Sequence, residues 1–344
     1  MKRKLFMVVS VALTVMMAMT GCSLQNNTAK TNNSSNESAK KVVNIAYGGT
    51  SGHMPHLAEI AKQNKYFEEE LSKIGYEPNY LSFSGAGPEV NEAIVSNKVD
   101  IAFYGDLPAV VLKSKGVGIS LVGINNSNTN MNLIVPKDSP ITSVKDIKGK
   151  KIIVLKGTVT QNYFQHLIDA NNMKINEIEV VNAAKDANSA FLSGSVDGYV
   201  ATDIISEKLV QDNSAKVIDS TINNPQWSSQ ATVISRDEFA ENNPEAPVAV
   251  LKALIRAKDY AKENNEEAYK MLDSGFGESS TKRIYDIDGG KFDFFSVDAT
   301  DYSINKLKDL NNFLIDQKLI STSVDINKFI NKSYYEKAVK ELES

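Results

Sequence analysis

Small polar and glycine-rich loops recur in this sequence directly after short apolar runs that predict β-strands. They occupy residues 48–53, 84–88, 104–106, 156–161 and 201–203, and a helical pattern follows each. In open α/β sheets, ligands bind at the carboxyl ends of the strands, beside the free N–H groups of the following helices. These loops and nearby polar residues supply the candidate ligand-binding residues Ser51, Gly52, His53, Ser84, Gly85, Tyr104, Gly105, Asp106, Asn132, Gly157, Thr158, Thr160, Gln161, Asp203 and Trp227.

The loop at residues 156–161 is the best candidate for holding an anion. Gly157 lets a ligand approach the backbone, Thr158 and Thr160 carry hydroxyl groups, and the first amides of the following helix have no intrahelical partner. The candidate loops contain one lysine and no arginine, because the chain's arginines are Arg3, Arg236, Arg256 and Arg283. A bidentate guanidinium clamp is therefore not evident. We expect backbone amides and hydroxyl groups to bind any anion.

Several of these residues also have a structural interpretation. Asp106 and Asp203 precede helical patterns, where an aspartate caps the helix, but two carboxylates facing one cleft could also hold an ammonium group. Ser84 and Gly85 suit a tight turn as well as a ligand contact. Trp227, the sole tryptophan, could stack on a ligand or pack against the adjacent proline.

The sequence has few residues or motifs that indicate metal binding or catalysis. His53, His56 and Glu59 could be interpreted as a metal site, but His166 is the only other histidine. Contacts at a helix start are therefore favoured, and no metal is predicted. The sequence has no Gly-x-Ser-x-Gly elbow, P-loop or dinucleotide fingerprint, and its single cysteine, Cys22, lies before the folded part. We predict a binding protein without a cofactor rather than an enzyme.

Charge and composition narrow the class of protein further. Thirty-eight Lys and Arg residues against 42 Asp and Glu residues give a net charge of -4, and no basic stripe is interleaved with aromatic residues. A nucleic-acid partner is therefore not expected. With 42% hydrophobic and 23% charged residues, the composition is globular, and 344 residues suggest two domains.

The N-terminus resembles a bacterial lipoprotein signal. Basic residues at positions 2–4 precede an apolar run at 5–18, and small residues then lead to Cys22. We predict a signal peptide at residues 1–21, lipidation of Cys22, and a flexible polar tether at residues 22–41. The protein is thus expected to be extracytoplasmic and anchored to the bacterial cell membrane through its lipid.

Alternating strand and helix patterns predict two α/β lobes. Strands of the first lobe, residues 42–128, are expected at 42–47, 78–83, 99–104 and 119–124. Strands of the second lobe, residues 129–238, are expected at 131–135, 152–155, 178–181, 196–201, 216–218 and 230–235. Residues 239–344 are mainly helical, with helices at 248–264, 266–272, 302–317 and 326–340, and must pack on structure already formed.

Five short motifs follow one another along the chain, at residues 89–100, 105–109, 144–152, 156–158 and 190–198. The most specific is an Asp-Ile-Lys-Gly-Lys turn before a strand that ends in Gly-Thr. This order resembles the nitrate/sulfonate/taurine-type substrate-binding proteins of ABC importers. The resemblance implies a two-lobed α/β fold, periplasmic binding protein type II, with two hinge crossings and C-terminal helices that return to the first lobe.

The resemblance also implies a function. Such a protein would capture a small organic anion or zwitterion, of the sulfonate or taurine kind, between its lobes and deliver it to the permease and ATPase of an ABC importer. A heteroaromatic ligand such as a thiamine precursor, or an enzyme that shares the fold, remains as an alternative. The implied partners are the ligand, the transporter and, through the lipid, the membrane, for a protein that acts as a monomer.

Overall fold

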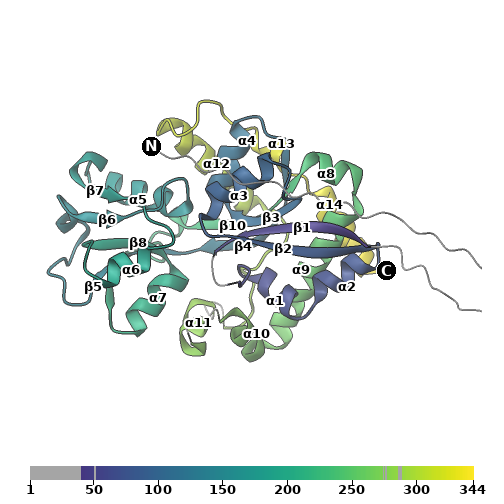
Figure 1. Ribbon diagram of the computed structural model, residues 1–344, viewed down its shortest axis with the longest axis horizontal. Helices are drawn as coiled ribbons and strands as arrows, with labels where there is room; N and C mark the ends of the chain where they lie inside the picture. Colours follow the sequence, from purple (N-terminus) through teal and green to yellow (C-terminus); the bar gives the residue numbers. More distant parts are fainter. Residues whose placement is uncertain (1–39, 50–51, 274, 276, 286–288) are drawn as a thin grey trace, which may run out of the picture. The chain divides into compact units, whose positions relative to one another are not determined.

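The computed structural model describes residues 40–49, 52–273, 275, 277–285 and 289–344. Lys40–Ser344 form one compact unit that contains two five-stranded sheets (Figure 1). The predicted signal peptide, Cys22, the tether up to residue 39, and Ser51 lie outside the described residues. Within the described residues, no helix combines the length and the apolar character that crossing a membrane requires.

The first sheet contains the N-terminal strands. Its strands, in spatial order, are β2 (Tyr76–Phe83), β1 (Lys41–Gly48), β3 (Ile101–Gly105), β10 (Ser229–Arg236) and β4 (Ile119–Thr129). β1 pairs in parallel with β2 and β3, as strands joined by helices do, whereas β10 is antiparallel to β3 and β4. The connecting helices are α1 (Leu57–Gln63), α2 (Tyr66–Ser72), α3 (Ala86–Val95) and α4 (Asp106–Ser114).

The second sheet is built in the same way. Its strands, in spatial order, are β7 (Glu179–Val181), β6 (Lys151–Ile153), β8 (Gly198–Thr202), β5 (Met131–Pro136) and β9 (Ala215–Ser220). The α-helices are α5 (Val159–Ala170), α6 (Ala187–Leu192) and α7 (Asp203–Gln211). Short 3-10 turns are η1 (Val144–Ile147), η2 (Ile175–Glu177) and η3 (Pro225–Trp227).

The chain crosses between the two sheets twice, which confirms the predicted fold. β4 of the first sheet leads through Asn130 into β5 of the second, and after β9 the chain returns through η3 to β10. The strand predicted at residues 230–235 is expected in the second lobe, but β10 is hydrogen-bonded to β3 and β4 of the first sheet. A buried apolar strand pattern does not indicate which sheet the strand joins, so that part of the predicted 129–238 lobe is corrected.

The C-terminal helices cover both faces of the first sheet. They are α8 (Asp237–Asn242), α9 (Glu245–Glu263), α10 (Asn265–Leu272), α11 (Glu278–Tyr285), α12 (Asp301–Asp316), α13 (Ile326–Phe329) and α14 (Ser333–Leu342). α9 and α14 share a core with α1 and α2, and α12 shares a second core with α3 and α4. Figure 1 shows these green and yellow helices around β1 to β4. The helix predicted at 326–340 is divided, because Ile330 pairs with Leu121 of β4.

Alternation along the strands decides which core each side chain enters. In β3, Ile101 and Phe103 enter the core with α9, whereas Ala102 and Tyr104 enter the core with α3 and α4. All four side chains are buried. The parallel strands thus fill the interior with their side chains and leave their carboxyl ends, with the loops that follow, for the site.

Candidate functional site

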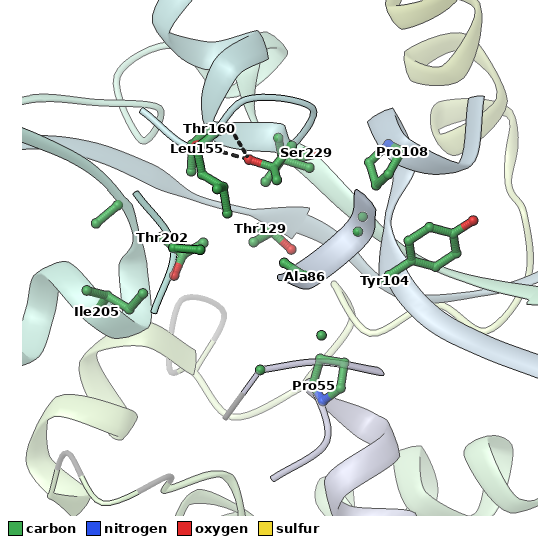
Figure 2. Close-up of a pocket in the computed structure, with 18 of the residues that line it drawn as sticks. Pro55, Ala86, Tyr104, Pro108, Thr129, Leu155, Thr160, Thr202, Ile205 and Ser229 are labelled. Atoms are coloured by element: carbon green, nitrogen blue, oxygen red, sulfur yellow. Dashed lines mark hydrogen bonds between the residues drawn. The ribbon is translucent and has the colours of Figure 1, made fainter. Parts of the chain in front are cut away.

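A cavity of about 390 Å³ lies between the two sheets, at the carboxyl ends of their parallel strands. Loops after β1, β2 and β3 line one side, and loops after β6, β7 and β8 line the other. The two crossings contribute Thr129 and residues 229–231. Figure 2 shows Pro55 and Ala86 opposite Thr202, with Thr129 between them. Each of the five loops expected from the sequence supplies at least one lining residue.

The structure brings together part of the predicted site. The predicted residues that line the cavity are Ser84, Tyr104, Gly105, Thr158 and Thr160. The predicted residues that do not line it are Gly52, His53, Gly85, Asp106, Asn132, Gly157, Gln161, Asp203 and Trp227. Ser51 lies outside the described residues.

Some of the non-lining residues support the cavity wall from behind. Gln161 Oε1 accepts the backbone N–H of Gly157 at 2.7 Å, which closes the turn that precedes α5. Asn132 Nδ2 donates to Ser206 Oγ at 2.6 Å and ties β5 to α7. Their polar groups are therefore used within the fold and do not face the cavity.

The hydroxyl groups at the start of α5 are also used within the fold. Thr158 Oγ1 donates to the carbonyl oxygen of Leu155 at 2.7 Å and lies 2.9 Å from Thr160 Oγ1. Thr160 Oγ1 is 3.4 Å from the same carbonyl oxygen. The hydroxyl protons of both threonines thus have acceptors inside the turn. The backbone N–H of Gln161 donates to the carbonyl oxygen of Thr158 at 3.1 Å. The donors that the first turn of α5 can offer a ligand are therefore the amides of Val159 and Thr160, which have no intrahelical acceptor.

Asp106 serves the first sheet rather than the cavity. It is buried at the first position of α4, where Oδ1 accepts the N–H of Leu107 at 2.8 Å and the hydroxyl of Ser229. Oδ2 accepts the N–H of Gln230 at 3.0 Å. Burial raises the pKa of Asp106, and these hydrogen bonds oppose that increase. Asp106 thus accepts a backbone N–H of the first turn of its own helix and fixes the start of β10.

Asp203 has the same position at the start of α7. Its Oδ1 accepts the N–H of Ile204 at 2.8 Å, and burial raises its pKa to about 7. Neither this carboxylate nor that of Asp106 belongs to a residue that lines the cavity. The N-cap residues are Gly105 and Thr202, so each aspartate, as the first residue of its helix, accepts the N–H of the residue that follows it.

The helices around the cavity differ in the charge of their first turns. Glu89 in α3, Asp106 in α4 and Asp203 in α7 each place an acidic residue there, whereas α5 has no acidic residue in its first turn. A helix N-terminus carries a positive partial charge that a nearby carboxylate offsets. The start of α5 therefore has the least compensated positive end among these four helices, and it contributes Val159 and Thr160 to the wall.

The rings of two aromatic candidates, Tyr104 and Trp227, pack against side chains of the protein. Tyr104 enters the core with α3 and α4, and Figure 2 shows its ring directed away from Thr129 and Thr202. The ring of Trp227 is parallel to that of His166, with centroids 6.0 Å apart, and His166 lies 4.3 Å from the ring of Phe313 in α12. Trp227 of the second crossing thus stacks on His166 of α5, which in turn contacts Phe313 of α12.

His56 and Thr129 line the cavity but are not among the ligand-binding residues predicted from the sequence. His56 was considered together with His53 as a metal ligand, and no group of three His, Cys, Asp or Glu residues suited to a metal is found in the described part of the chain. His56 follows Pro55 directly before α1, which was a usable signal because helix starts after strands face the cleft. Thr129 lies at the end of β4 and had no such signal.

Comparison with known proteins agrees with this architecture. A protein of Bacillus subtilis (strain 168), described as a candidate aliphatic sulfonates-binding protein, is 24% identical over 290 residues, which is 82% of this chain and 84% of that protein. The structure of a candidate periplasmic sulfonate-binding protein of an ABC transporter from Methylobacillus flagellatus KT superposes with a TM-score of 0.72 at 27% identity, covering 89% of this chain and 96% of that one.

One relative is named as an enzyme and not as a binding protein. It is the 4-amino-5-hydroxymethyl-2-methylpyrimidine phosphate synthase of Aspergillus parasiticus, 24% identical over 215 residues, which is 58% of this chain and 61% of that protein.

The fold is that of periplasmic binding proteins, as the sequence resemblance predicted. A family model described as NMT1/THI5 like matches residues 50–268, more than half of the sequence. The chain therefore belongs to the NMT1/THI5-like family.

Proposed function

We propose that this protein is an extracytoplasmic solute-binding lipoprotein that captures a small organic sulfonate and delivers it to the permease and ATPase of an ABC importer. The observation that carries the proposal is the cavity between the two sheets, with the N-terminus of α5, whose first turn has no acidic residue, at its wall. A sulfonate is a permanent monoanion with several acceptor oxygens, so it suits backbone amides at a helix start. The names of the Bacillus and Methylobacillus relatives support the same ligand class.

The rest of the wall favours a sulfonate with an apolar substituent over a zwitterion. Leu155, Tyr199 and Ile205 line the side formed by the second sheet, and Pro108 lines the other. Apolar groups of this kind gain free energy by covering a hydrocarbon or aromatic substituent. The carboxylates that could have held the ammonium group of taurine accept backbone N–H groups in the first turns of α4 and α7, and neither residue lines the cavity.

A pyrimidine ligand is the second candidate, favoured by the synthase from Aspergillus parasiticus among the relatives. The two candidates differ in charge, since a hydroxymethylpyrimidine is neutral at pH 7 whereas a sulfonate is anionic. Only the anion gains from the positive end of α5. We place the sulfonate first for that reason, and we propose that binding leaves the ligand chemically unchanged.

The test is a thermal-shift and calorimetric panel on the purified mature protein. The panel contains 1-butanesulfonate, taurine, nitrate and 4-amino-5-hydroxymethyl-2-methylpyrimidine. A ligand at about 100 times its dissociation constant adds about 2.7 kcal/mol to the free energy of unfolding. We expect 1-butanesulfonate to stabilise the protein most and to be recovered intact. Stabilisation by the pyrimidine alone, or conversion of the sulfonate, would contradict the proposal.

A further inference from the structure

His56 is a buried residue at the cavity wall whose environment is unusually well defined. It precedes α1, lines the cavity, and is 6% exposed. Its ring packs against Tyr285 and Phe295, with centroid distances of 5.9 and 6.2 Å. Its backbone has a φ of 51°, a region that is strained for a residue with a side chain. Strained backbone conformations are common at ligand-binding sites, so packing alone does not explain the position of His56.

The side-chain amide of Asn126 determines which ring nitrogen of His56 carries the proton. Asn126 Oδ1 accepts the backbone N–H of Asn128 at 2.9 Å, which leaves Nδ2 as the end of the amide that faces His56 Nδ1, at 3.2 Å. An amide NH2 group donates hydrogen bonds and does not accept them. Nδ1 must therefore be the acceptor, and the proton of the neutral ring lies on Nε2.

The position of Tyr285 and the burial of the ring are compatible with this state. The Tyr285 hydroxyl lies 3.0 Å from His56 Nδ1, where it can donate to the unprotonated nitrogen. Burial lowers the pKa of His56 to about 4, because a charged ring would lose its hydration. At neutral pH the imidazole is thus uncharged and has one N–H group, at Nε2.

That N–H group points toward a residue of the cavity wall. Among the described residues, the structure gives Nε2 one hydrogen-bond partner, Thr129 Oγ1 at 3.4 Å. This distance exceeds the about 2.7–3.2 Å of ordinary hydrogen bonds. Both residues line the cavity, and Figure 2 shows Thr129 between its two sides. The Nε2–H donor is therefore held in place by the contacts of Nδ1 with Asn126 and Tyr285, and its own hydrogen bond to Thr129 is long.

We propose that His56 contacts the ligand directly, donating from Nε2 together with the Thr129 hydroxyl to an oxygen of a bound sulfonate. Asn126 and Tyr285 are positioning residues that hold the required tautomer. The inference rests on the proposed function for the identity of the anion. It adds a specific donor on the side of the first sheet, opposite the amides of α5, and it makes a neutral histidine part of anion recognition.

A matched pair of variants tests the contact. His56→Gln keeps an N–H donor at nearly the same distance from the backbone, whereas His56→Leu removes it, and both place a side chain at the same strained φ. With 1-butanesulfonate as the probe, we expect His56→Leu to bind about 10- to 100-fold more weakly and His56→Gln to stay within about threefold of the wild type. Equal affinities for the wild type and His56→Leu would overturn the proposal.

Nitrogen-15 NMR of the histidine-labelled wild type provides a second readout, of the tautomer and of the ligand contact. The chain has three histidines, so the His56 signals can be assigned from the spectrum of one variant. We expect the Nε2–H tautomer in the free protein and a shift of that N–H on addition of 1-butanesulfonate. The Nδ1–H tautomer, or an unmoved signal in a protein that binds the probe, would overturn the proposal. If the wild type binds no sulfonate, the proposed function fails, while the tautomer in the free protein is still tested.

Discussion

Gly105 is predicted to set how closely the two lobes approach each other. It ends β3 in the first sheet, and Val159 begins α5 in the second lobe. A Cβ atom on Gly105 would lie 2.6 Å from Val159 Cγ1. The backbone of Gly105, with φ of -66° and ψ of 155°, suits alanine without strain. Gly105→Ala therefore perturbs the contact between the lobes and leaves each lobe free to fold.

The size of the effect follows from this contact. Carbon atoms in ordinary contact lie about 3.5–4.0 Å apart, so the two groups must separate by roughly 1 Å. Val159 is β-branched and has essentially one side-chain rotamer in a helix, so α5 itself must move. Overpacking of this kind costs about 1–3 kcal/mol. We expect ligand affinity to fall by about 5- to 150-fold, because only the state with the lobes in contact bears that cost.

Calorimetry with the ligand that best stabilises the wild type is the assay, and thermal unfolding without ligand is its control. Gly105→Ala should unfold within a few degrees of the wild type. The double variant Gly105→Ala/Val159→Ala removes the clashing methyl group and should recover most of the affinity. An affinity of Gly105→Ala within twofold of the wild type would refute the reasoning, as would a double variant that stays as weak as the single one.

Three further predictions concern other parts of the chain. Cys22→Ala should prevent lipid anchoring, so cell fractionation should find the protein in the medium or unprocessed; retention with normal processing would contradict this. Burial raises the pKa of Asp203 to about 7, so the wild type should lose stability relative to Asp203→Asn as the pH rises from about 4 to 7; denaturant titrations should find this difference changing by a few kcal/mol. Lys306→Met should lower the free energy of unfolding by about 1–3 kcal/mol, because Lys306 Nζ donates to Ser228 Oγ and Asn128 Oδ1, one in each crossing.

The position of the cavity could be predicted from the sequence because it follows from local rules. Strand patterns that end in polar, glycine-containing loops, such as those at Ser84 and Gly105, identify the carboxyl ends of parallel strands, and those ends share one edge. The order of motifs added the two lobes and the return of the C-terminal helices. The position of the cavity and the two-lobed fold can both be predicted from short segments of neighbouring residues.

The partners of individual polar groups could not be predicted, because they depend on contacts far apart in the chain. Asp106 is bonded to Ser229 and Gln230, which enter its surroundings only because β10 joins the first sheet. The hydroxyl of Thr158 was expected to face a ligand, but the carbonyl oxygen of Leu155 is a nearer acceptor. The proton of the His56 ring lies on Nε2 because Asn126, 70 residues away, donates to Nδ1. Residue type and spacing do not encode such pairings.

The distribution of donors across the cavity matters more for closure than their number. A ligand shifts an equilibrium between separated and touching lobes only by its difference in affinity for the two states. Moving the ratio from about 1:99 to 99:1 takes about 5.5 kcal/mol, and a hydrogen bond to a charged acceptor contributes about 1.5–3 kcal/mol. If an anion first binds the amides of α5, then the donor of His56 on the first lobe is reached only when the lobes touch. That bond supplies roughly a quarter to a half of the required difference, whereas the same donor placed beside α5 would bind the anion and leave the lobes apart.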